Sequence, residues 1–128
     1  STARDQERRY PYFGRVFAWE SICSAWPGQA ADRYTGPFDT PTAHPLLVVN
    51  TLFDPATPYA GAVAASKILP GSRLLTVNGW GHVTVVTGSN CADRHVATYL
   101  LNGTLPAEGT QCAPDEVPFA APSKESNS

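Results

Sequence analysis

Methionine is absent from this sequence of 128 residues, so the chain holds no initiator residue. The charged opening, Ser1 to Arg9, has neither the apolar core nor the small-residue cleavage site of a signal peptide. We therefore expect that Ser1 is not a translation start. No apolar run approaches the roughly 20 residues needed to cross a bilayer, because the longest candidate, Pro45 to Phe53, ends at Asp54-Pro55. We expect no membrane span.

An excess of positive charge is also missing. The chain has 9 basic against 11 acidic residues and a net charge of -2. Nucleic-acid binding needs a basic stripe, and electrostatic membrane anchoring needs a polybasic cluster. The sequence shows neither, so we expect neither nucleic acid nor a membrane as partner. The length allows one modest hydrophobic core.

Cysteine is scarce, and its number is odd. Cys23, Cys91 and Cys112 include no C-x-x-C pair of the kind that zinc sites and redox motifs use. We predict a disulfide between Cys91 and Cys112, which the chain-entropy model values at about 3 kcal/mol. Cys23 is then left without a partner, which in an oxidising compartment suggests a partner elsewhere in a longer protein. Cys91 and His95 have the i, i+4 spacing of zinc ligands, but without further ligands we expect no metal.

The composition and the hydrophobic pattern of the sequence change twice along the chain. Residues 1–44 are charged, then aromatic, then irregular, with a helix expected from Tyr10 to about Cys23; residues 45–112 carry the regular α/β pattern. Residues 113–128 are rich in proline, serine, alanine and acidic side chains, so we expect most of this tail to be disordered.

Within 45–112, strand and helix signals alternate. The apolar run Leu46 to Asn50 lacks the alternation of a half-exposed strand and predicts a strand covered on both faces. Thr57 and Pro58 have the chemistry of an N-cap and a first helical residue, and Pro70-Gly71 stops the helix. A second strand, a glycine-rich turn and a second helix follow, at 73–78, 79–82 and 90–101.

The order strand, helix, strand, helix is typical of a parallel α/β sheet with right-handed crossovers. Two parallel strands alone leave an unpaired edge and need cover on both faces. We therefore expect an α/β fold whose remaining strands come from another part of the protein.

Two residues stand where an open α/β sheet carries its functional side chains, just beyond the carboxyl ends of strands. Asp54 follows the first strand and His82 follows the second. A carboxylate bonded to one imidazole nitrogen leaves the other nitrogen free to act as a general base. This pair needs a nucleophile, yet the sequence contains no G-x-S-x-G elbow.

The stretch from Pro45 to Pro58, which ends in Asp54-Pro55-Ala56-Thr57-Pro58, and the turn Gly79-Trp80-Gly81-His82 resemble the C-terminal region of the tripeptidyl aminopeptidase-like α/β-hydrolases. These enzymes are related to the prolyl aminopeptidases of peptidase family S33. The element Cys23, Trp26-Pro27 is similar to the same family, and the resemblance covers roughly Cys23 to Cys112.

The resemblance implies a fold and an activity. The chain is expected to be the C-terminal portion of an α/β-hydrolase fold, with 1–44 as the end of a lid or connecting segment. Asp54 is expected to be the acid and His82 the base of a Ser-His-Asp triad. The serine would lie in an N-terminal portion that is also the possible partner of Cys23, and no cofactor is needed.

A secreted serine exopeptidase that removes short peptides from free N-termini is the function that the resemblance implies. Such an enzyme needs a carboxylate for the substrate ammonium, and Glu20 is the acidic residue beside the aromatic cluster near Trp19. Trp80 is expected either to line the rim of the site or to pack over the last helix. This chain alone is expected to be inactive.

Two alternatives stay open. An esterase, lipase or haloperoxidase-like hydrolase would use the same Asp54 and His82. A disulfide-stabilised binding module that has lost catalysis would fit the missing nucleophile, but it would have no chemical reason to keep both residues at adjacent strand ends.

Overall fold

The structure is a computed structural model that describes residues 2–14, 26–83 and 88–120. The chain divides into two compact units, Ser1–Thr35 and Gly36–Ser128. The first contains helix α1, Thr2–Arg9. Asp5 in its first turn and Arg8 in its last turn complement the helix dipole, and the two side chains also form an ion pair.

Of the helix that we predict from Tyr10 to about Cys23, the structure describes only residues 10–14, in which a bend and a turn precede the helical Gly14, and residues 15–25 lie outside the described part. Phe13 and Gly14 donate backbone hydrogen bonds to the carbonyl of Tyr10, and α1 lies before this segment. The predicted irregular character of the segment after Gly28 agrees with the structure, which has no helix or strand between Trp26 and Leu46.

The second unit contains a parallel sheet of three strands in the order β1-β2-β3, with β1 at Leu47–Phe53, β2 at Arg73–Trp80 and β3 at Gln111–Cys112. The first two strands match the predictions and extend beyond them at the carboxyl end. β3 is an addition that the sequence pattern does not predict, because two residues carry no periodicity. A bulge between Thr51 and Phe53 shifts the register, so that Phe53 is opposite Trp80.

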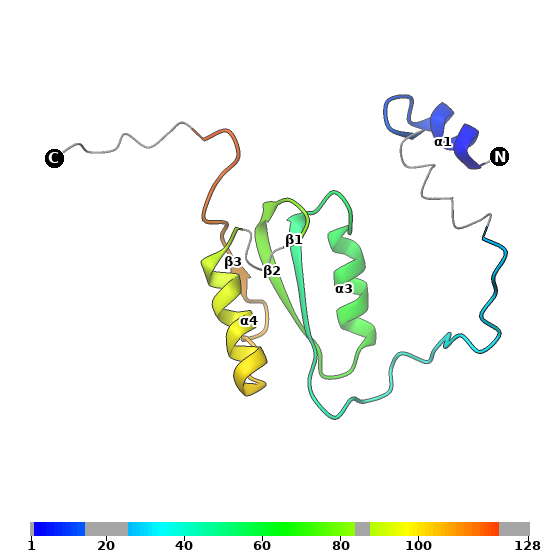
Figure 1. Cartoon of the computed structure of the whole chain (residues 1–128). Helices are drawn as coiled ribbons and strands as arrows, with labels where there is room; N and C mark the ends of the chain where they lie inside the picture. The colour runs from blue at the N-terminus through cyan, green and yellow to red at the C-terminus, as the bar shows by residue number, and fades with distance from the viewer. Residues whose placement is uncertain (1, 15–25, 84–87, 121–128) are drawn as a thin grey trace. The chain divides into compact units, whose positions relative to one another are not determined.

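Two helices accompany the sheet, α3 at Tyr59–Ile68 and α4 at Asn90–Asn102, and Figure 1 shows the sheet between them. On one face, the Tyr59 hydroxyl is 2.7 Å from that of the buried Thr76. On the other, Ala92 of α4 packs with the buried side chains of Leu75 and Val77. The middle strand β2 is therefore covered on both faces, whereas the residues of β1 from Leu47 to Asn50, for which we predict the same, are only half-buried.

The structure contradicts the predicted N-cap of the first helix and agrees with the predicted end of the second. Thr57 does not cap α3: the N-cap is Pro58, without a side-chain hydrogen bond, because the Thr57 hydroxyl is bonded to Asp54. The predicted end of the second helix near residue 101 agrees with the structure, since α4 ends at Asn102 and Gly103 takes the left-handed conformation at its C-cap. No helix of the described part is long and apolar enough to cross a bilayer.

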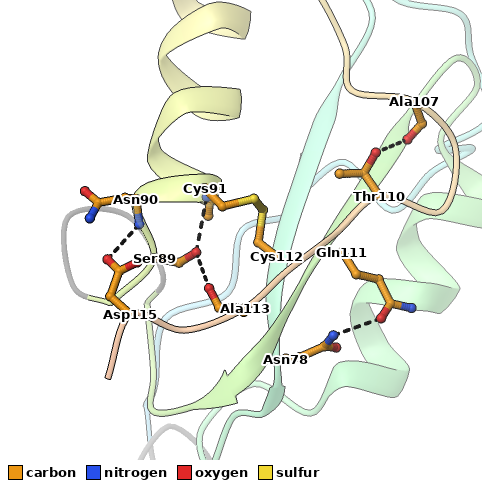
Figure 2. The surroundings of a disulfide bond; sticks show 11 residues. Asn78, Ser89, Asn90, Cys91, Ala107, Thr110, Gln111, Cys112, Ala113 and Asp115 are labelled. Atoms are coloured by element: carbon orange, nitrogen blue, oxygen red, sulfur yellow. Dashed lines mark hydrogen bonds between the residues drawn. A yellow bond between two sulfur atoms is a disulfide. The ribbon is translucent and has the colours of Figure 1, made fainter. Parts of the chain in front are cut away.

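A disulfide joins Cys91, at the start of α4, to Cys112 of β3, as predicted (Figure 2). Hydrogen bonds flank it. The buried Ser89 caps α4 and donates its hydroxyl to the carbonyl of Ala113, and the backbone N–H of Asn90 donates to the Asp115 carboxylate. Ala113 and Asp115, which the sequence assigns to the tail, are thus bonded to the body of the unit, while 121–128 lie outside the described residues.

Candidate active site

The two residues singled out at the strand ends lie next to each other. Asp54 directly follows β1, and His82 is two residues beyond β2. The His82 Nδ1 atom is 3.0 Å from Oδ2 of Asp54 and 3.2 Å from its Oδ1. The structure therefore brings the acid and the imidazole within hydrogen-bonding distance across 28 residues of sequence.

The Asp54 carboxylate is enclosed by its own loop. Its Oδ1 accepts hydrogen bonds from the backbone N–H groups of Ala56 and Thr57, both at 2.8 Å. Its Oδ2 accepts one from the Thr57 hydroxyl at 2.7 Å. Only 3% of the Asp54 side chain is exposed, against 49% for His82.

Two opposing effects act on the pKa of this carboxyl. Burial raises it, but the hydrogen bonds from the Thr57 backbone, the Thr57 hydroxyl, His82 and the Ala56 backbone outweigh burial and hold the pKa of Asp54 well below its ordinary value. Asp54 is therefore ionised at neutral pH.

The ionised carboxylate fixes the state of the imidazole. A carboxylate can only accept hydrogen bonds, so Nδ1 of His82 carries a proton and donates it toward Asp54. In the neutral ring, Nε2 is then the free acceptor. This is the state that a general base needs when it takes a proton from a nucleophile or a water molecule.

Two further polar residues belong to this network, and the sequence-based prediction missed both. The Asn50 side-chain amide donates to the carbonyl of Thr57 at 3.3 Å and to its hydroxyl at 3.4 Å. The Thr57 hydroxyl is also 3.4 Å from Nδ1 of His82. The sequence does contain signals that could have identified them. Asn50 is a polar residue at the end of an apolar run, and Thr57 lies three residues after Asp54.

A cleft of about 230 Å³ surrounds the pair. Its lining includes Asn50, Asp54, Thr57, His82 and Val83. A larger cleft of about 500 Å³ lies over Gly79, Trp80 and Pro114 and shares Thr51 and Val83 with the first. The chemistry belongs to the smaller cleft, because only that one contains the carboxylate and the imidazole.

Trp80 lies at the rim of the larger cleft and is 52% exposed. Its ring stacks on that of Phe53, with the centroids 5.9 Å apart. The two stacked rings are both more than half exposed and form an apolar surface at the carboxyl ends of β1 and β2. Glu20 and Cys23, which the sequence also singles out, lie outside the described residues.

The backbone around His82 is unusual. Gly81 has φ of 101°, which glycine tolerates, and this agrees with the predicted turn. Val83, however, has φ of 69°, a conformation that is strained for a β-branched side chain. Strained residues of this kind are concentrated at functional sites, and here one directly follows the imidazole.

Comparisons with known proteins identify the family of the chain. The model of the TAP-like protein family matches residues 10–112. Serine protease Hip1 of Mycobacterium tuberculosis is 39% identical over 90 residues, and Carboxylesterase B of the same species is 38% identical over 101 residues. Tripeptidyl aminopeptidase of Streptomyces lividans is 34% identical over 116 residues.

The matches cover most of this chain and a small part of each relative. They include 70%, 73% and 87% of the chain, but 17%, 18% and 21% of the respective relatives. The chain thus spans about a fifth of the length of these curated relatives. The match to the family model extends over most of the chain and includes both strand-end residues. The chain belongs to the TAP-like family of serine hydrolases and contains part of its α/β-hydrolase fold.

Proposed function

We propose that this chain is the C-terminal part of a serine exopeptidase of the tripeptidyl or prolyl aminopeptidase type, in which Asp54 and His82 are the acid and base of the triad. The observation that carries the proposal is the hydrogen bond between them at the ends of adjacent parallel strands. The nucleophilic serine and the oxyanion hole would come from an N-terminal portion, because the sequence printed here has no serine elbow.

In this proposal, Nε2 of His82 takes the proton of the serine as it attacks the carbonyl carbon of a peptide, and then gives it to the leaving amine. Asp54 accepts the Nδ1–H bond throughout and stabilises the imidazolium. The substrates are peptides with free N-termini, and Glu20 and Trp80 are candidate substrate contacts. The disulfide between Cys91 and Cys112 favours a secreted protein.

An esterase reaction is the second candidate, and one observation favours it. Carboxylesterase B is as similar to this chain as the peptidase relatives are, and the same acid and base serve ester hydrolysis equally well. A non-catalytic binding module remains the third candidate, and an activity assay separates all three.

The test uses the chain alone and mixed with the N-terminal portion, supplied with an Ala-Pro-Ala chromogenic tripeptide amide and with a short-chain ester. Hydrolysis of the amide by the mixture alone, abolished by His82→Ala and by a serine-directed phosphonate, is the expected result. The matched control is His44→Ala, at an exposed histidine before β1, which should retain full activity.

Other outcomes have definite meanings. Hydrolysis of the ester without the amide would favour the esterase. Activity of the chain alone would contradict the proposal, because a nucleophile other than the missing serine would then be at work. No activity in either sample, with a folded complex confirmed by size-exclusion chromatography, would favour the binding module.

A further inference from the structure

Beside the two sulfur atoms of the Cys91–Cys112 disulfide lies an imidazole that can bind a metal. His95 lies one helical turn after Cys91 on α4, and one of its ring nitrogens, Sγ of Cys91 and Sγ of Cys112 all lie within 4.8 Å of one another. Two thiolates and one imidazole are a donor set that suits Zn²⁺. We propose that reduction of the Cys91–Cys112 disulfide turns these three residues into a Zn²⁺ site.

The distances fit the coordination of zinc. With Zn–S bonds of about 2.3 Å and tetrahedral angles, the two sulfur atoms of a zinc site are roughly 3.8 Å apart. Once the S–S bond is broken, rotation of the two side chains is enough to separate the sulfur atoms by this amount. His95 is already near enough to complete a three-residue set, and water fills the fourth position, as is usual in sites with three protein ligands.

The backbone around the two cysteines does not depend on the disulfide alone. Cys112 is opposite Val77 in the parallel pair of β2 and β3. The Ser89 hydroxyl donates to the carbonyl of Ala113 at 2.7 Å, and the Asn90 N–H donates to Asp115 at 2.8 Å. These bonds, drawn in Figure 2, join the start of α4 to the segment after β3. They keep the two thiols facing each other after reduction.

The burial of the three residues sets the order of events. Cys112 is buried at 1% exposure, whereas Cys91 and His95 are partly exposed. A dithiol reductant therefore attacks the sulfur of Cys91 and releases Cys112 as the thiol. A second thiolate of the reductant then frees Cys91, and the reductant leaves as a disulfide. Zn²⁺ binds with release of the two thiol protons.

The test uses the whole chain in a Cys23→Ser background, so that the metal meets only the two thiols of interest. The reductant is a trialkylphosphine, which becomes its oxide by taking oxygen from water and leaves no competing thiol. Zn²⁺ is then titrated by calorimetry, and Co²⁺ is titrated as a probe of thiolate coordination by its absorption spectrum. The reduced chain should bind one metal ion and the oxidised chain none.

Removal of the imidazole is the decisive comparison. His95→Ala should weaken Zn²⁺ binding by the reduced chain by at least roughly tenfold, since even indirect partners of a metal ligand are worth that much. The control His44→Ala should leave the affinity unchanged. Equal affinity in the reduced chain and in its His95→Ala variant would overturn the proposal.

A second measurement guards against an unfolded chain that binds metal through its thiols. Far-ultraviolet circular dichroism follows the reduced chain before metal is added, and the titration is repeated in guanidinium chloride. The proposal requires retained secondary structure and tighter binding than in the denatured chain. Binding of equal strength in both states would refute it, and so would the absence of binding.

Discussion

The two loops that carry Asp54 and His82 differ in the hydrogen bonds that hold these side chains. The loop after β1 closes on itself: within four residues, Asp54 receives three hydrogen bonds from Ala56 and Thr57. In the loop after β2, His82 is half exposed, and its Nδ1 lies 3.0 Å from Oδ2 of Asp54 in the first loop. Donors of its own loop hold the acid, and the acid in turn accepts the Nδ1–H bond of the imidazole.

This difference tells which loop organises the site. A buried carboxylate with several donors is costly to disturb, so the β1 loop acts as the fixed reference. The β2 loop includes a strained residue, Val83, and an exposed imidazole. Substitutions in the first loop should therefore disturb the positions of both side chains, while those in the second should act on Asp54 only through the loss of its bond to His82.

The largest expected effect comes from breaking the bond between the loops. In the proposed enzyme, assembled with its N-terminal portion, Asp54→Asn should lower kcat by about 10⁴-fold, because an amide can donate to Nδ1 and stabilise the wrong tautomer of His82. Amide hydrolysis under saturating substrate measures it. A loss of less than tenfold would show that the imidazole is positioned by something other than Asp54.

A smaller effect is expected inside the β1 loop. Thr57→Val keeps the shape of the side chain but removes the hydroxyl that donates to Oδ2 and accepts from Asn50. We expect kcat to fall roughly tenfold, as for one lost hydrogen bond to a charged group, with little change in KM. Thr57→Ser is the matched control, and its activity should stay near that of the wild type. Equal losses in both variants would mean that the methyl group matters rather than the hydroxyl.

The lowered pKa of Asp54 gives a signed dependence of stability on pH. Because its pKa is lower in the folded state than the unfolded value of about 4, the folded protein binds fewer protons in acid, and stability increases with pH there. The contribution is complete above about pH 5 and is lost progressively as the pH falls through 4 and below. Urea unfolding of wild type and Asp54→Asn should give a constant difference in free energy above pH 5 that shrinks below about pH 4. A difference that shrinks already near neutral pH would contradict the lowered pKa.

The smallest expected effect concerns the strain in the β2 loop. Val83→Gly should stabilise the chain by about 1 kcal/mol, because relief of a positive φ exceeds the entropy that a new glycine loses on folding. Urea unfolding measures the gain. The matched control is Val48→Gly in β1, where the backbone is extended and the same change should destabilise. Destabilisation by Val83→Gly would show that its side-chain contacts outweigh the strain.

The regular elements could be predicted because their signals are local. A continuous apolar run predicted β1, and Pro58 and Pro70-Gly71 marked the two ends of α3. β3 could not be predicted, since its two residues pair through backbone groups and carry no pattern. The prediction that Thr57 caps α3 was wrong for a physical reason. Its hydroxyl could bond either to the helix N-terminus or to the Asp54 carboxylate, and it donates to the carboxylate, which is the stronger partner because it is charged. The roles of Asn50 and Thr57 appear only when the loop is folded.

The disulfide between Cys91 and Cys112 closes a covalent ring over a sequence separation of 21. Its part from Gly103 to Glu108 contains no strand and is mostly exposed, which makes it a natural site for a protease. A single cut there cannot divide the molecule. The nicked chain would keep its two pieces joined, with the added mass of one water, and would separate into two fragments only under reducing electrophoresis.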